Sequence, residues 1–217
     1  MGREETQLSA TERTHAANRV ESDAQMTRRL VVGLTGASGV IYGVRALELL
    51  RSIPDIETHA IISPSALQTL MAETDHTPEY VRDLAHTVHN FRDIGAAVAS
   101  GSFRTLGMLV APCSVKTLSG IATGYSDELI IRAADVCLKE RRRLVLLFRE
   151  TPLHAGHIEA MAQATRNGAI VMPPVPAFYH RPATVDDIVT QTVGRALDLF
   201  GIDTGVKRWK EGETPLS

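Results

Sequence analysis

Residues 30–39 read LVVGLTGASG, and this stretch decides the fold. Its first five residues are almost wholly apolar, which is typical of a strand buried on both faces of a sheet. A glycine-rich turn follows, and the apolar residues after it recur at helical spacing: Val40, Val44, Leu47 and Leu50. A buried strand that enters a helix through a tight glycine turn indicates the first unit of a doubly wound α/β protein.

The rest of the chain repeats this alternation of apolar strands and helical segments. Further strands are predicted at 57–62, 105–111, 144–148 and 169–172, and helices at 114–122, 127–140, 154–167 and 184–200. Pro64 suits the first turn of another helix, whereas residues 74–104 do not separate into helix and loop. The pattern predicts one three-layer domain with a Rossmann- or flavodoxin-like parallel sheet.

Composition excludes several classes of function. The 217 residues carry 23 basic and 25 acidic side chains, a formal net charge of −2, so no broad charge attracts nucleic acid or an anionic membrane. Aromatic residues are only 5%, which disfavours a platform for stacking bases. No apolar run reaches the roughly 18 residues that span a bilayer. We therefore expect neither a nucleic-acid nor a membrane partner.

The ends of the chain differ from its middle. Residues 1–28 lack apolar periodicity and are expected to form a disordered tail before a domain at 29–203 and a C-terminal tail at 204–217. The N-terminal segment has no apolar stretch of the signal-peptide kind, and Met26 is an alternative start. Cys113 and Cys137 show neither disulfide nor metal spacing, so a reducing cytoplasm is the expected location.

Small, hydroxyl or charged residues follow four of the predicted strands. They are Gly36, Ala37, Ser38 and Gly39, then Ser63, then Ser114, Lys116 and Thr117, and finally Arg149 and Glu150. Ligands of doubly wound folds bind beyond the carboxyl ends of the strands. Glycines let the backbone approach a ligand, and helix N-termini attract anions. The sequence thus predicts a site for a phosphate or a flavin, although the glycine spacing is not the G-x-G-x-x-G fingerprint of dinucleotide sites.

Some of these residues have a simpler interpretation. Ser114 and Thr117 are common helix caps, and the charge run at 139–143 (KERRR) suits a solvated helix end. Arg149 is different, because a cation directly after an apolar strand is costly without an anionic partner.

Two further patterns favour structural roles. His154 and His157 have a spacing that suits zinc, but no third ligand is evident, so capping or surface histidines are favoured. Cys113 is a candidate nucleophile without an identifiable base, and a buried core cysteine is the favoured interpretation.

Three long stretches closely resemble the UbiX-type flavin prenyltransferases, which are related to the flavin-containing cysteine decarboxylases. They are LVVGLTGASGVIYGVRALELL at 30–50, the segment at 100–154 that contains APCSVKTLSG and KERRRLVLLFRETPLH, and GAIVMPPVPAFYHRP at 168–182. The resemblance covers about residues 29–203. It implies an enzyme that joins the dimethylallyl group of dimethylallyl monophosphate to reduced FMN at N5 and C6. The implied product is prenylated FMN for UbiD-type decarboxylases, formed without a metal in a homododecamer with sites at subunit interfaces.

The resemblance also implies roles for individual residues. FMN would be bound by Gly36, Ala37, Ser38, Ser63, Ser114, Val115, Lys116, Thr117, Arg132 and Arg149. Val115 and Lys116 would act through backbone N–H groups, and Arg132 would support the flavin or a subunit contact. The prenyl phosphate would be held by Lys139, Tyr179 and Arg195. The implied catalytic side chains are Ser38 near the flavin N5, Glu73, and Glu150 as a proton donor to the leaving phosphate.

Two other functions stay open at this point. One is an FMN-dependent decarboxylase of a cysteinyl substrate, against which the phosphate-binding segments KERRR and AFYHRP speak. The other is a non-enzymatic subunit that carries flavin to an aromatic-acid decarboxylase. The sequence does not say whether ubiquinone synthesis or aromatic-acid degradation uses the product, or which prenyl chain is preferred.

Overall fold

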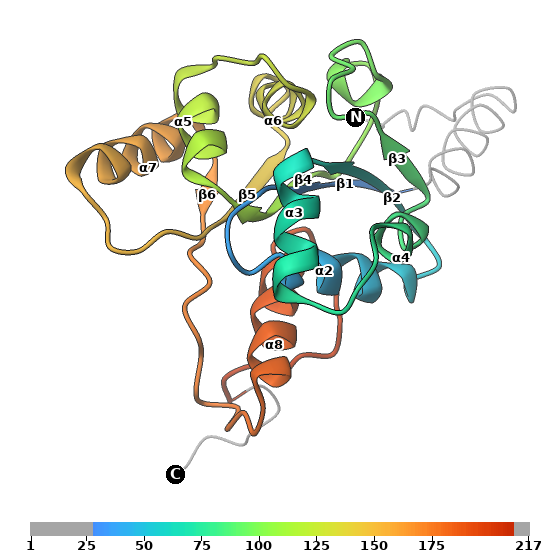
Figure 1. Cartoon of the computed structure of the whole chain (residues 1–217), viewed down its shortest axis with the longest axis vertical. Coiled ribbons are helices and arrows are strands. Elements are labelled where there is room, and N and C mark those ends of the chain that lie inside the picture. The colour runs from blue at the N-terminus through green and yellow to red at the C-terminus, as the bar shows by residue number, and fades with distance from the viewer. Residues whose placement is uncertain (1–27, 211–217) are drawn as a thin grey trace, which may run out of the picture.

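A single parallel sheet organises the part of the chain that the computed structural model describes, residues 28–210 (Figure 1). Its strands are β1 (Arg28–Leu34), β2 (Ile56–Ile62), β3 (Thr87–His89), β4 (Gly107–Cys113), β5 (Arg143–Phe148) and β6 (Ile170–Val171). They lie in the order β3-β2-β1-β4-β5-β6, so the winding direction reverses between β1 and β4. This is the strand order of a doubly wound α/β fold, and the predicted fold class is confirmed.

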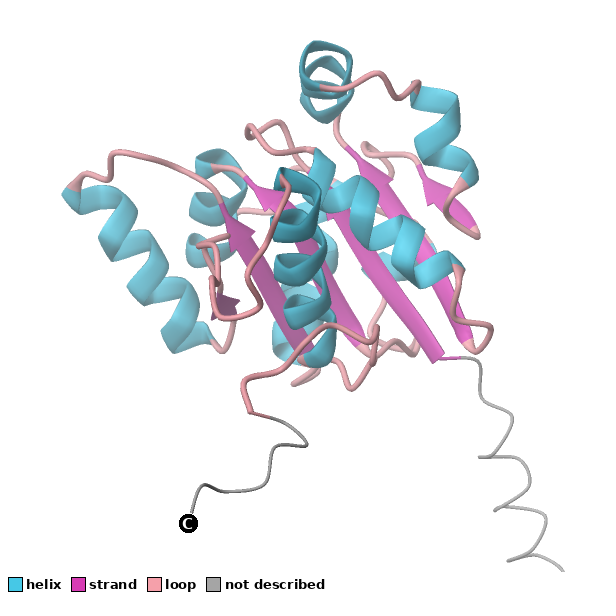
Figure 2. Cartoon of the chain, turned by 90° about the horizontal axis from the view of Figure 1, so that it is seen from below, coloured by secondary structure: helices cyan, strands magenta, loops and turns pink. Residues whose placement is uncertain are grey.

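Helices cover both faces of the sheet (Figures 1 and 2). They are α2 (Ile41–Arg51), α3 (Pro64–Glu73), α4 (Pro78–Asp83), α5 (Val115–Thr123), α6 (Leu129–Lys139), α7 (Ala155–Asn167) and α8 (Val185–Asp198), with a 3-10 turn at η1 (Ala97–Ala99). Helices α2 and α8 pack on one face, whereas α5 and α6 cover the other, with α7 packed outside α5. No helix within residues 28–210 is long and apolar enough to cross a membrane.

Each face of the sheet has its own apolar core. Alternate side chains of β1 point to opposite sides: Leu30 and Val32 pack with α2 and α8, whereas Val31 packs with α6. The alternation continues in β4 and β5, which explains why these strands read as continuous apolar runs. The three-layer prediction follows directly from this double burial.

The predicted elements agree with the structure except in one region. Most predicted boundaries lie within two residues of the observed ones. The ambiguous residues 74–104 contain the short helix α4, the three-residue edge strand β3 and the turn η1. Elements of three to six residues are too short to show a hydrophobic period, so the sequence pattern could not resolve them.

Both ends of the described chain belong to the folded domain. Arg28 belongs to β1, although the sequence analysis assigned it to the tail, and residues 1–27 and 211–217 lie outside the described residues. Residues 204–210, which we call the C-terminal strap, lie against α8. Val206 is buried there, and a Cβ on Gly194 would come within 2.3 Å of its Cγ1. Arg208 pairs with Asp198 at 2.7 Å at the end of α8.

Gly43 allows α2 to lie close against β4. A Cβ at this position would be 2.3 Å from the carbonyl oxygen of Ala111 and 2.7 Å from Leu34 Cγ. We predict that Gly43→Ala lowers the free energy of unfolding by about 1–3 kcal/mol, because overpacking outweighs the gain in helix propensity. Urea denaturation measures the change. Gly95→Ala is the matched control, since its Cβ would meet only Asp93 Oδ1 at 3.4 Å; equal stability of the two variants would contradict the prediction.

Candidate functional site

Thr35 joins the two strands between which the winding reverses. Its hydroxyl donates to the carbonyl oxygen of Pro112 at 2.7 Å and accepts from the backbone N–H of Ser114 at 2.9 Å. The side chain is buried, so water does not compete for these bonds. Thr35 thereby holds the turn after β1 against the start of α5, at the carboxyl edge of the sheet.

Two capped helix N-termini face this edge. Ser63 accepts from the N–H of Ala66 at 3.0 Å and begins α3, and Ser114 accepts from the N–H of Thr117 at 3.4 Å and begins α5. Both helices follow strands directly, so both N-termini lie where the parallel strands end. The capping interpretation of Ser114 is confirmed, and the cap leaves other N–H groups of each first turn available to an anion.

The loop after β1 is held by α3. A Cβ on Gly36 would lie 2.4 Å from Ser65 Cβ, so only glycine permits this approach. Glu73, the last residue of α3, accepts from the N–H groups of Gly39 at 2.8 Å and Val40 at 3.3 Å. Its carboxylate therefore caps the N-terminus of α2 and shapes the loop that carries Ala37 and the exposed Ser38.

Arg149 brings a positive charge to the same edge. Its N–H donates to the carbonyl oxygen of Cys113 at 3.1 Å, which places it beside the end of β4. Within residues 28–210, no hydrogen bond or ion pair engages its guanidinium. Burial raises the pKa of Tyr42, in the first turn of α2, and the nearby charge of Arg149 opposes this shift. The neighbouring Glu150 is half-buried and accepts from the N–H of Thr151 at 2.9 Å.

Two cations expected near the flavin are paired on the protein surface. Lys116 Nζ lies 2.6 Å from Glu128 Oε2, and this hydrogen bond raises the pKa of Lys116. Its side chain is thus held toward the start of α6, leaving its backbone N–H at the start of α5. Arg132 pairs with Asp135 at 2.8 Å, one turn along α6.

The three residues expected to hold the prenyl phosphate lie elsewhere in the chain. Lys139 ends α6, immediately before β5, whereas Arg149 follows β5, and a strand of that length spans about 20 Å. Arg195 lies in the last turn of α8 and pairs with Asp198. That end of α8 lies at the amino edge, because the carbonyl of Gly201 accepts from Arg28 at 3.3 Å.

Tyr179 lies in a different region, the extended segment between β6 and α8. Its hydroxyl donates to the carbonyl of Lys207 at 3.1 Å in the C-terminal strap. Within the described chain, no hydrogen bond or ion pair joins Lys139, Tyr179 or Arg195 to Arg149 or Glu150. Lys139 and Arg195 therefore lie at the opposite edge of the sheet from Arg149 and Glu150 within one chain.

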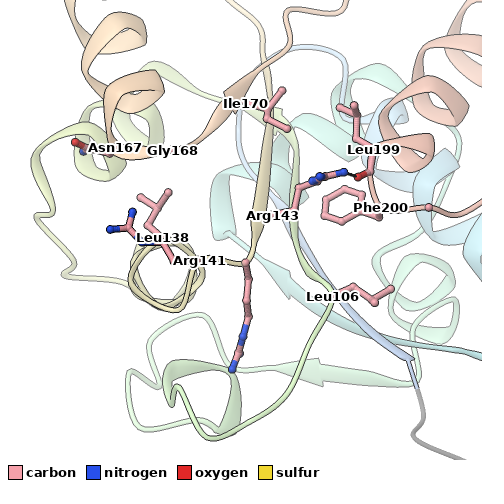
Figure 3. A pocket seen from close by; sticks show the side chains of 11 residues that line it. Leu106, Leu138, Arg141, Arg143, Asn167, Gly168, Ile170, Leu199 and Phe200 are labelled. Carbon is pink, nitrogen blue, oxygen red and sulfur yellow. Dashed lines mark hydrogen bonds between the residues drawn. The ribbon is translucent and has the colours of Figure 1, made fainter. Parts of the chain in front are cut away.

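A cavity of about 720 Å³ also lies at the amino edge (Figure 3). The C-terminal ends of α6, α7 and α8 meet around it, and it is lined by Arg141, Arg142 and Arg143. Arg143 donates to the carbonyl of Leu199, and Arg142 to that of Phe103 at 2.6 Å. These arginines satisfy carbonyl groups in a region where three helix dipoles end, so this cavity is not the crevice that the strand ends predict.

The histidine and cysteine patterns have structural roles. His154 caps α7 by accepting from the N–H of Gly156 at 3.0 Å, and its ring lies 3.7 Å from that of His157. No group of three His, Cys, Asp or Glu side chains in residues 28–210 is placed to hold a metal ion. Cys113 is fully buried, and burial raises the pKa of its thiol, so it stays protonated as a core side chain.

Several side chains that shape these regions were not among the residues predicted from the sequence. Thr35 and Tyr42 stand within the LVVGLTGASGVIYG stretch, but nothing in a spacing pattern distinguishes a bridging threonine from a core one. Gln191 and Trp209 contact Tyr179 from α8 and from the strap. Gln191 lies on the buried face of α8, where a polar residue is uncommon, and no expectation from the sequence included it.

A doubly wound parallel sheet whose carboxyl edge gathers two helix N-termini, a glycine loop and the cation of Arg149 defines a flavin- or nucleotide-binding α/β protein. The Flavoprotein family model matches residues 18–197. The chain is 59% identical to flavin prenyltransferase UbiX of Escherichia coli K12 over 175 residues, 81% of this chain and 93% of that protein. It is 54% identical to UbiX of Thauera aromatica over 186 residues, 85% and 95% of the two chains.

Solved structures agree with these relatives. The crystal structure of AnUbiX (PadA1) in complex with FMN and dimethylallyl pyrophosphate superposes with a TM-score of 0.83 at 52% identity, covering 86% of this chain and 99% of that one. A dodecameric FMN-dependent UbiX-like decarboxylase from Escherichia coli O157:H7 has a TM-score of 0.82 at 49% identity, covering 84% and 100%. The chain belongs to the flavoprotein family and, within it, to the UbiX flavin prenyltransferases.

The Thr35 bridge should be needed for flavin binding. Thr35→Val keeps the shape but leaves the carbonyl of Pro112 and the N–H of Ser114 without their buried partner. We predict a loss of about 1–3 kcal/mol in the free energy of unfolding and weaker FMN binding, measured by denaturation and flavin titration. Thr123→Val is the control, because that hydroxyl bonds only within its own helix. Unchanged FMN affinity in Thr35→Val would contradict the prediction.

Proposed function

We propose that the protein transfers the dimethylallyl group of dimethylallyl monophosphate to reduced FMN and releases prenylated FMN. The observation that carries the proposal is the carboxyl edge, where the guanidinium of Arg149, which has no hydrogen bond or ion pair within residues 28–210, shares the edge with two helix N-termini. A phosphorylated flavin matches this edge, because its phosphate takes N–H donors and a cation. The close relatives named flavin prenyltransferase support the reaction.

The residues of the carboxyl edge bind and orient the flavin in this proposal. Gly36, Ala37 and Ser38 provide a loop that a ligand approaches closely, and Ser63 and Ser114 to Thr117 provide the helix N-termini. Reduced FMN supplies the nucleophile. Ser38 is exposed on the loop and handles a proton near the flavin, while Glu73 acts by holding that loop in place. Arg132, paired on the surface of α6, supports a subunit contact.

Lys139, Tyr179 and Arg195 bind the prenyl phosphate without a metal. Cationic and hydroxyl donors stabilise the charge that develops on the phosphate as the allylic C–O bond breaks. Since these residues lie apart from Arg149 within one chain, neighbouring subunits complete each site. We propose a homododecamer on this ground and from the dodecameric relative. Val175, Phe178 and Val185 support such contacts, because they are 75%, 69% and 76% exposed near Tyr179.

Three further assignments belong to the same proposal. Residues 29–203 form the catalytic unit between the two chain ends, and its location is the cytoplasm, in keeping with two free, buried cysteines. The product serves a UbiD-type decarboxylase. Adding the prenylated flavin product to a UbiD-type apo-decarboxylase and measuring decarboxylation tests this last assignment.

A mass spectrum of the flavin tests the reaction. The protein is incubated anaerobically with reduced FMN and dimethylallyl monophosphate, with the pyrophosphate run in parallel. We expect the flavin to gain the mass of one dimethylallyl unit over many turnovers. An unchanged flavin would overturn the proposed function. A decarboxylated cysteinyl peptide, or binding without turnover, would favour the decarboxylase or the carrier function instead.

Glu150 is the proposed acid that protonates the leaving phosphate. Glu150→Gln keeps the shape but cannot give up a proton, so we predict ligand binding near normal and a rate of flavin alkylation lower by about 10²-fold. Single-turnover measurements at saturating substrate separate the two effects. The exposed Glu159 on α7 offers a control in Glu159→Gln. A normal rate with weak FMN binding would mean that Glu150 only orients Arg149.

Sharing of sites between subunits predicts complementation. Lys139→Ala and Arg149→Ala should each be nearly inactive, but mixed oligomers contain sites in which both residues are intact. Random mixing in a symmetric assembly should restore about a quarter of the wild-type activity. The Lys139→Ala, Arg149→Ala double variant is the control: it is taken through the same subunit exchange and contains no intact site. Intact mixed oligomers without restored activity would place both residues in a site of one chain.

A further inference from the structure

Gln191 joins three segments of the chain at one point. From the buried face of α8, its Nε2 donates to the Tyr179 hydroxyl oxygen at 2.9 Å and to the carbonyl oxygen of Lys207 at 2.8 Å. Tyr179 Oη donates to the same carbonyl at 3.1 Å. Because Gln191 is only 5% exposed, water does not replace these bonds.

The donors and acceptors of this network have one consistent arrangement. Turning the Gln191 amide over would set its Oε1 against the carbonyl of Lys207, so two acceptors would face each other. With Nε2 in place, the Tyr179 oxygen receives a hydrogen from Gln191 and sends its own hydrogen to Lys207. The direction of the Tyr179 O–H bond is therefore determined by Gln191.

The partners of Gln191 are themselves held in place. The Tyr179 ring meets the rings of Trp209 and His180 edge-on, with centroid distances of 5.7 and 5.8 Å. The C-terminal strap is seated on α8 at Gly194, where any Cβ would collide with Val206. The carbonyl of Lys207 thus has a definite position relative to α8.

We infer that Gln191 is a positioning residue that keeps the Tyr179 hydroxyl ready to donate to the phosphate of the prenyl substrate. This inference rests on the proposed function, in which Tyr179 binds that phosphate. A phosphate oxygen is charged and takes the Tyr179 hydrogen in preference to the neutral carbonyl of Lys207. Gln191 continues to hold the oxygen atom, and its own donation strengthens Tyr179 as a donor.

A double-mutant cycle tests whether Gln191 acts through Tyr179. Gln191→Met has a similar length and removes both donors. We expect it to raise the KM for dimethylallyl monophosphate about tenfold, as for a lost hydrogen bond to a charged group, with kcat and FMN affinity within about twofold. In the Tyr179→Phe background, the same change should have no further effect on KM. Gln163→Met on α7 is the matched control and should leave all parameters unchanged.

The outcomes of this experiment are distinct. An equal rise in KM in both backgrounds would show a merely structural role and overturn the inference, as would an unchanged KM in Gln191→Met. If Gln191→Met does not fold, Gln191→Glu keeps the length and reverses the polarity, so its carboxylate takes the Tyr179 hydrogen. It should also raise KM, and only when Tyr179 is present; an unchanged KM would again overturn the inference. Wild-type turnover is measured first, so failure of the proposed function is recognised before any variant is compared.

Discussion

The hydroxyl of Thr35 sits at the point on which the rest of the structure depends. The sheet reverses its winding between β1 and β4, so the connections after these strands depart to opposite faces and leave a crevice between them. The crevice has a definite shape only if the two departing segments are fixed to each other. Thr35 does this with one buried hydroxyl, whose O–H donates to the carbonyl of Pro112 in β4 and whose oxygen accepts from the N–H of Ser114 before α5.

Charge is distributed unevenly between the two edges of the sheet. At the carboxyl edge, Arg149 has no acidic hydrogen-bond partner among residues 28–210, and the N-termini of α3 and α5 add positive potential, whereas the carboxylate of Glu73 caps α2. At the amino edge, where three helices end, Arg143 donates to the carbonyl of Leu199 at the end of α8, and Arg142 donates to the loop carbonyl of Phe103. The same residue type therefore brings a positive charge to the proposed anion site at one edge and bonds backbone carbonyl groups at the other.

Lys139 and Arg195 lie at the amino edge of the sheet, so the proposed phosphate site requires association of subunits. A parallel sheet separates residues that precede its strands from residues that follow them by the length of a strand. The proposed substrate has a phosphate at one end and a reacting carbon at the other. Residues from both edges of the sheet must therefore lie close together around it. In the proposed shared site, a neighbouring subunit brings its amino edge to the carboxyl edge, and the exposed apolar segment around Phe178 is available for contact.

Local sequence patterns determined much of this protein. The apolar runs, the glycine loop and the cap Ser114 were predictable, because burial on two faces, tight turns and capping each leave a mark within a few residues. The motifs at 30–50, 100–154 and 168–182 also indicated the family. The short elements between 74 and 104 left no period to read.

Only the tertiary structure decided the partners of individual polar side chains. Glu73 caps a loop more than thirty positions earlier in the chain, Thr35 bridges to β4, and Gln191 meets both Tyr179 and Lys207. Hydrogen bonds of this kind depend on atoms brought within about 3 Å by the folding of distant segments. Sequence periodicity indicates which face of an element is buried, but it carries no information on which polar atom of a distant segment will be the hydrogen-bond partner.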